Sequence, residues 1–231
     1  MNDESFFNLN RSRLLNYILE GEQSRALEHL NTLSESMGHN AVMDKILSPV
    51  LVNIGNLWHQ EQISLAAGYL AGKITETFLL TLKPEEKPSQ SAGTAVIGNI
   101  EDDYHSLGRK LVGTFLNYAG WKVIDLGNDV LPVTFIDAAL ENKAHVIGVS
   151  AMMLTTARNI IEVRRELDRR GFEGKIPLAV GGAVFKVRPD LVSELGGDGT
   201  ADNAIDAPAL FVKLKNSFSG VSGLPRDGVT Q

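Results

Sequence analysis

Short apolar runs alternate with amphipathic helical patterns through the second half of the sequence, and this alternation constrains the fold more than any other feature. The strand-like runs are TAVIGN (94–99), KVIDLG (122–127), HVIGVSA (145–151), IPLAVGG (176–182) and GDGTA (197–201). A segment with apolar residues at three-and-four spacing follows each run. Because parallel strands need crossover connections and bury both faces, the pattern predicts a doubly wound α/β domain with a flavodoxin-like, five-stranded parallel sheet.

The first half carries a helical pattern throughout. Apolar residues recur at helical spacing in RLLNYILEG, QSRALEHLNTLSESMG, AVMDKILSPVLVNIGNLWHQ and SLAAGYLAGKITETFLLTL, which predicts a bundle of four or five helices. Prolines, charges and small polar residues in KPEEKPSQSAG then separate the halves. We therefore predict a helical domain over residues 1–83, a linker over 84–93, an α/β domain over 94–217 and a flexible tail over 218–231.

Composition removes several classes of function. The 231 residues include no cysteine, which excludes disulfides, thiolate nucleophiles and thiolate metal sites. A formal charge of −6 predicts no direct nucleic-acid partner. No apolar run is long enough to span a bilayer, and the polar start MNDESFFNLNRSR lacks the plan of a signal peptide, so we expect a cytoplasmic protein without a membrane partner.

Ligands of doubly wound sheets bind beyond the carboxyl ends of the strands, at the point where the strand order reverses. In a flavodoxin-like order this point lies between the first and third strands. The loops that meet there, with the loop after the fourth strand beside them, carry polar or backbone-exposing residues. These residues are Asp102, Asp103 and His105 in the first loop, Ser150, Thr155 and Thr156 in the second, and Gly181, Gly182 and Ala183 in the third.

Common uses of such a sheet do not fit these loops. The sequence has neither GxxxxGK[ST] nor GxGxxG after the first strand, and the acidic first loop has the wrong charge for a phosphate. A receiver domain needs an aspartate and a lysine where Ser150 and Thr200 end the third and fifth predicted strands. His105 alone would leave zinc with too few ligands, so it fits best as an axial ligand of a metal that brings its own equatorial ligands.

The segment Asp103-Tyr104-His105-Ser106-Leu107-Gly108 resembles the DxHxxG motif of cobalamin-binding domains. In register with it, AGWKVIDLGNDV, VSAMMLTTA and AVGGA resemble later segments of corrinoid methyl-carrier proteins. The first half resembles the helical cap that covers the cofactor in methionine synthase, methanogen corrinoid proteins and light-sensing regulators. The resemblance spans roughly residues 11–215, and three ordered motifs make it far more specific than one.

The resemblance implies that His105 is the lower axial ligand of cobalt, in the base-off/His-on state. Asp103 would hold the second ring nitrogen, and Thr156 would extend the relay. Ser150 would bond the displaced benzimidazole, while Gly108, Gly181 and Gly182 would leave room for the cofactor. The other positions assigned to cofactor binding on the same ground are Tyr104, Ser106, Leu107, Met152, Leu154, Thr155, Ala183 and, over the upper face, Trp58.

Simpler structural roles remain open for several of these residues. Asp103 could be the N-cap of the following helix, Ser150 could only end a strand, and Gly181 and Gly182 could only form a turn. In the cap, Gly68 and Tyr69 stand where light-sensing regulators carry Glu-His, so the photochemical pair is missing.

Two functional hypotheses follow from the resemblance. The first is a methyl carrier without a complete active site of its own, which binds methylcobalamin or hydroxocobalamin and serves partner methyltransferases. The second is a cobalamin-dependent sensor that acts through a regulatory partner, with adenosylcobalamin as its cofactor. The small subunit of a radical mutase fits less well, because those domains lack the helical cap. The sequence leaves the methyl donor, the acceptor and the oligomeric state open.

Overall fold

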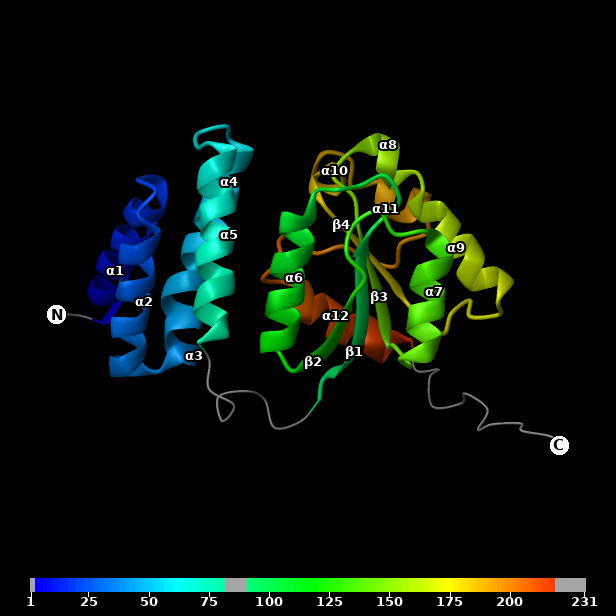
Figure 1. Ribbon diagram of the computed structural model, residues 1–231, viewed down its shortest axis with the longest axis horizontal. Coiled ribbons are helices and arrows are strands. Elements are labelled where there is room, and N and C mark those ends of the chain that lie inside the picture. The colour runs from blue at the N-terminus through cyan, green and yellow to red at the C-terminus, as the bar shows by residue number, and fades with distance from the viewer. Residues whose placement is uncertain (1–2, 82–90, 219–231) are drawn as a thin grey trace. The chain divides into compact units, whose positions relative to one another are not determined.

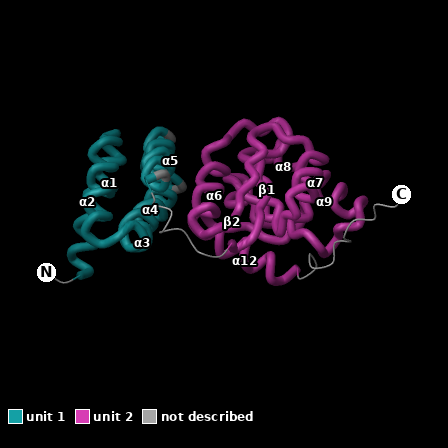
Figure 2. The backbone as a smooth tube through the Cα atoms, turned by 60° about the horizontal axis from the view of Figure 1, so that its bottom comes forward, with its two compact units in different colours: residues 1–88 teal, residues 89–231 magenta. Residues whose placement is uncertain are grey.

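The computed structural model describes residues 3–81 and 91–218. The chain divides into two compact units, residues 1–88 and 89–231, which Figure 2 colours separately and which are described one at a time below. Most of the predicted linker, residues 84–93, and almost all of the predicted tail, residues 218–231, lie outside the described residues. The domain boundaries therefore remain predictions.

The first unit is entirely helical within the described residues (Figure 1). A short α-helix, a π-helical turn and a longer α-helix follow one another without a break. The described part of this unit therefore forms four helical rods, in agreement with the predicted four or five helices. The elements are α1 (Asp3–Leu19), α2 (Gln23–Met37), the continuous rod α3 (His39–Val42), η1 (Met43–Leu47) and α4 (Ser48–His59), and α5 (Leu65–Leu80).

The π-helical turn in the third rod has a local cause in Pro49. Proline carries no N–H, so the carbonyl of Lys45, four residues earlier, loses its usual helical donor. Nε of Arg11 in α1 donates to that carbonyl over 2.6 Å. A side chain from α1 therefore replaces the missing backbone donor and ties two rods of the unit together.

The second unit contains a parallel sheet with helices on both faces (Figure 1), which confirms the predicted doubly wound α/β class. The strand order is β2-β1-β3-β4, so the reversal lies between the first and third strands, as a flavodoxin-like order requires. The strands are β1 (Gly93–Asn99), β2 (Trp121–Asp125), β3 (Val146–Ser150) and β4 (Leu178–Gly181).

The sheet has four strands in the described part of the chain, so the prediction of a fifth is wrong. The segment 197–201 meets β4 at a single bridge between Ala179 and Gly199. The N–H of Asp198 donates to Leu178 O, and the N–H of Val180 donates to Gly199 O. Two glycines in five residues give the segment little side-chain surface to pack, so pairing does not extend into a strand.

Alternating residues of β1 build the two cores of this unit. Ala95 and Ile97 pack against α6 (Ser106–Tyr118) and α12 (Ala207–Ser217), whereas Val96 faces α7 (Pro132–Glu141) and α9 (Ile160–Arg169). The remaining short helices are α8 (Leu154–Ala157), α10 (Ala183–Val187) and α11 (Leu191–Glu194).

The segment with helical spacing after the fourth predicted strand, VRPDLVSELGG (187–197), forms less helix than its pattern predicts. α10 ends before Pro189 and α11 begins after it, because the residue before a proline is driven out of the helical conformation; Arg188 has φ −130° and ψ 77°. None of the helices in the described ranges combines the length and the apolar character that a membrane crossing requires.

Candidate functional site

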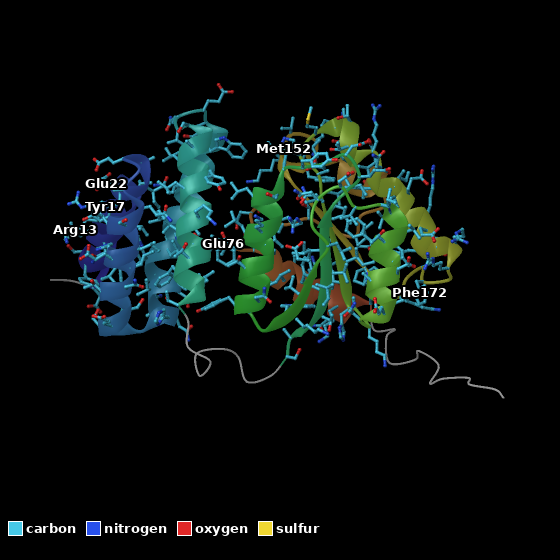
Figure 3. All side chains as sticks on the ribbon, in the orientation of Figure 1. Arg13, Tyr17, Glu22, Glu76, Met152 and Phe172 are labelled. Atoms are coloured by element: carbon cyan, nitrogen blue, oxygen red, sulfur yellow. The ribbon has the colours of Figure 1, made fainter. Side chains whose placement is uncertain are left out.

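The sheet register brings the three predicted loops to one edge. Asn99 at the end of β1 pairs with Ser150 at the end of β3, and Ser150 pairs with Gly181 at the end of β4. The loops that follow these residues therefore start side by side. Figure 3 labels Met152, which lies at this edge of the α/β unit.

Asp103 is the centre of the site, with no exposed surface. Its Oδ1 accepts hydrogen bonds from the side-chain amide of Asn99 (2.8 Å) and the N–H of His105 (2.9 Å). Its Oδ2 accepts from the N–H of Met152 (2.7 Å) and the hydroxyl of Thr156 (3.1 Å). Donors from β1, its loop and the β3 loop thus converge on one carboxylate.

This environment sets the charge of Asp103. Burial raises the pKa of the carboxyl, but the donated hydrogen bonds stabilise the anion and together lower the pKa below its ordinary value. Asp103 is therefore ionised at neutral pH.

His105 lies directly beside this anion. Its Nδ1 is 3.4 Å from Oδ1 of Asp103, and its side chain is 54% exposed. The carboxylate favours the tautomer with the proton on Nδ1, which leaves the lone pair of Nε2 free. The site presents one oriented imidazole nitrogen to a metal that arrives from outside.

Three further predicted residues have open space or an unpaired polar group beside them. Among the described residues, no group hydrogen-bonds the hydroxyl of Ser150. A Cβ added to Gly108 or to Gly181 would meet no atom within 4 Å. Gly108 is the third residue of α6. An unpaired hydroxyl and two open glycines at one edge fit a ligand that approaches the backbone closely.

Gly182 has a different reason for being glycine. Its φ is +116°, and a Cβ there would lie 1.9 Å from the carbonyl oxygen of Ala151. The fold therefore requires a glycine at this position, whether or not a ligand is bound.

A clip joins the His105 loop to the loop after β2. The hydroxyl of Tyr104 donates to Oδ2 of Asp129 (2.6 Å), and the N–H of Asp102 donates to Oδ1 (2.9 Å). Both aspartates have positive φ, 64° and 56°, which is uncommon outside glycine. The hydrogen bond from Tyr104 lowers the pKa of Asp129 and raises the pKa of the phenol. Two strained loops therefore hold each other in place.

The remaining predicted residues divide by exposure. Asp103 does not cap α6, because His105 occupies the N-cap position.

Trp58, at the end of α4, is 39% exposed and belongs to the helical unit, so its role at the site stays a prediction. Asp102 is exposed, as expected of a surface acid. Of the other predicted cofactor contacts, the exposed ones are Tyr104, Leu154 and Thr155, and the partly buried ones are Ser106, Leu107, Met152, Thr156 and Ala183.

Sequence reasoning missed two residues of this network, Asn99 and Arg109. Asn99 is fully buried, and its amide donates to Asp103 and, over 3.2 Å, to the carbonyl of His105. Nε of Arg109 donates to Oδ1 of Asn99 over 2.7 Å. A signal was present, because Arg109 lies in the buried stripe of α6 with Gly113 and Leu116. A charge at helical spacing within an apolar stripe needs a buried partner.

Comparison with known proteins agrees with this geometry. Residues 93–209 match the family model described as B12 binding domain, and residues 11–83 match a second model with the same description. Among curated proteins, trimethylamine corrinoid protein 1 of Methanosarcina mazei is 34% identical over 169 residues, which cover 71% of this chain and 77% of that protein.

Two solved structures resemble this one over 90% of the chain. The monomethylamine corrinoid protein of Methanosarcina barkeri has a TM-score of 0.69 at 26% identity, with 99% of its chain covered. A chain of the methanol:cobalamin methyltransferase complex MtaBC from the same organism has a TM-score of 0.55 at 26% identity, with 80% covered. Both the helical and the α/β parts therefore have counterparts in proteins of this kind.

Proposed function

This chain belongs to the B12-binding domain family, and we propose that it is a corrinoid protein that carries a methyl group on bound cobalamin between partner methyltransferases. The observation that carries the proposal is the exposed imidazole of His105, held by the buried anion of Asp103. We assign His105 as the cobalt ligand through Nε2, in the base-off/His-on state.

The residues around His105 fit such a cofactor. The hydroxyl of Ser150 lies at the end of β3, free to bond the displaced base, and Gly108 and Gly181 leave open space for the corrin and the nucleotide tail. Cobalamin, when bound, supplies a cobalt centre that takes a methyl group from one substrate and releases it to another. The protein's part is to hold the proton on Nδ1 of His105 and to keep the ring oriented.

Partners complete the activity. The named relatives are corrinoid proteins of methylamines, and one structural neighbour is part of a methanol:cobalamin methyltransferase complex. These names favour the carrier over the sensor. We propose methyltransferases as the partners and methylcobalamin and the reduced cofactor as the working forms. Residues 11–83 of the helical unit also match a B12 binding domain, and we propose that Trp58 of this unit contacts the cofactor.

A transfer assay tests this proposal. The purified protein is loaded with hydroxocobalamin, reduced with a strong reductant and mixed with a methylamine and, in turn, each methyltransferase encoded near its gene. We expect the absorption spectrum to change to that of the methylated cofactor, and His105→Ala to reduce the rate of this change. A matched control is His145→Ala, because His145 lies at the opposite end of β3. Loading without methylation by any neighbouring methyltransferase would contradict the carrier role.

A further inference from the structure

A line of polar side chains extends from the site to the end of β2. Arg109, which is 5% exposed, donates through Nε to Asn99 and through its other nitrogens to Asp125 and, over 3.1 Å, to Asn128. Asn99 then donates to Asp103, which holds His105. The side chains form one continuous connection from the exposed carboxylate of Asp125 to the imidazole.

The chemistry of this connection fixes the direction of one amide. Arginine has only donors, so the oxygen of the Asn99 side chain must face Arg109. The NH₂ group of Asn99 must then face the other way, toward Oδ1 of Asp103 and the carbonyl of His105. Within the described chain, Arg109 is the donor to the oxygen of Asn99. Without it, this buried oxygen would be left unpaired and the amide would be held from the Asp103 side alone.

Arg109 has no evident role in stabilising its own helix. It lies in the first turn of α6, where the helix dipole disfavours a cation. Burying a guanidinium also costs free energy unless its donors are paired. Both costs are offset by the contacts to Asn99, Asp125 and Asn128, and these contacts all face the loops that carry or clip His105.

We propose that Arg109 and Asn99 are positioning residues for the axial ligand. Both are too buried to touch the cofactor; they act by orienting the Asn99 amide, which holds Asp103 and the backbone of His105 in the geometry that directs Nε2 outward. This inference rests on the proposed binding of cobalamin by His105.

The test measures cobalamin affinity and the absorption spectrum of Arg109→Met, with unfolding followed in parallel. We expect the dissociation constant for hydroxocobalamin to rise about tenfold or more, with a smaller His-on fraction, as is typical when the partner of a metal-bound histidine is disturbed. Arg109→Lys keeps the positive charge but loses the planar guanidinium that bonds several partners at once, and should restore only part of the affinity. The matched control is Arg164→Met, because Arg164 is also mostly buried and pairs with Asp198, away from the site.

The outcomes separate the possible roles. An Arg109→Met protein that unfolds more easily, like Arg164→Met, but binds with wild-type affinity and spectrum would overturn the proposal. If Arg109→Met does not fold, Asp125→Asn decides, because Asp125 is 40% exposed and its replacement leaves the core intact. Asp125→Asn should raise the dissociation constant by about threefold, and an unchanged value would overturn the proposal. A wild-type protein that binds no cobalamin through His105 would instead refute the proposed function.

Discussion

Buried polar residues behave differently in the two units of this protein. In the helical unit, Asn10, Ser34 and Thr75 each donate to the carbonyl four residues earlier in their own helix. In the α/β unit, Asn99, Asp103 and Arg109 bond to one another across β1, its loop and α6. The first set satisfies itself locally, whereas the second depends on the tertiary fold.

The difference shows which buried polar groups cost folding free energy unless partners from other segments are in place. A side chain that bonds to its own helix needs no partner elsewhere and leaves little trace if it is replaced by an apolar group. A buried carboxylate needs several donors from separate segments, and removing it leaves all of them unsatisfied. Convergence of buried polar groups, rather than their presence, identifies the candidate site.

The largest effect that sharpens this comparison is expected from Asp103→Ala. It removes the acceptor of four donors, of which the Asn99 amide is buried and the other three are partly buried, so the α/β unit should lose about 3–5 kcal/mol of its free energy of unfolding. Thr75→Val in the helical unit is the counterpart and should change stability by less than about 1 kcal/mol. Each unit contains one tryptophan, Trp58 or Trp121, so urea unfolding followed by fluorescence in single-tryptophan variants reports on each unit. Equal effects would contradict the comparison.

Two neighbouring glycines separate the demands of the fold from those of the ligand. Gly182→Ala should destabilise the α/β unit by about 1–3 kcal/mol through its positive φ, and further through the contact with Ala151. Gly181→Ala should leave stability within about 0.5 kcal/mol yet weaken cobalamin binding. Urea titration and cofactor titration of both variants check this. Wild-type affinity in a stable Gly181→Ala protein would show that this glycine does not serve the cofactor.

The smallest expected effect is a pH dependence of the helical unit. The Nε2 of His29 is buried without a hydrogen-bond partner in the described chain. Burial lowers the pKa of this histidine below its ordinary value, a hydrogen bond with the Asn10 backbone opposes the shift, and the charge of Arg13 adds to it. The unfolded chain then takes up the proton first as pH falls. The stability from neutral His29 is complete above roughly pH 6.5 and is lost as pH falls toward the lower folded pKa.

Asp103 affects stability at lower pH than His29, because the folded state favours its ionised form, whereas it favours the neutral form of His29. Its lowered pKa contributes stability that is present above roughly pH 4 and is lost in stronger acid.

The prediction for His29 is checked by Trp58 fluorescence in a Trp121→Phe background. The helical unit should lose stability between pH 7 and 5, and His29→Leu should reduce this loss. An equal loss in the His29→Leu protein would refute the assignment to this histidine.

The sequence predicted the α/β class because strand and helix periods alternate plainly, and it predicted the loops because parallel strands end at one edge. The sequence predicted one strand too many. Whether the glycine-rich segment 197–201 pairs as a full strand depends on tertiary packing, and the pattern of apolar residues carries no information about that packing. Asn99 escaped notice because a polar residue at a strand end is common. The partners of Arg109 come from β1 and the β2 loop, and only the folded register brings them together.

The central claim is that His105 supplies a nitrogen ligand to cobalt, and electron paramagnetic resonance of the Co(II) form tests it most directly. The protein is produced with ¹⁵N-labelled histidine and loaded with cobalamin. We predict a superhyperfine splitting from a single histidine nitrogen, retained in His145→Ala and absent in His105→Ala. The same splitting in His105→Ala would contradict the claim.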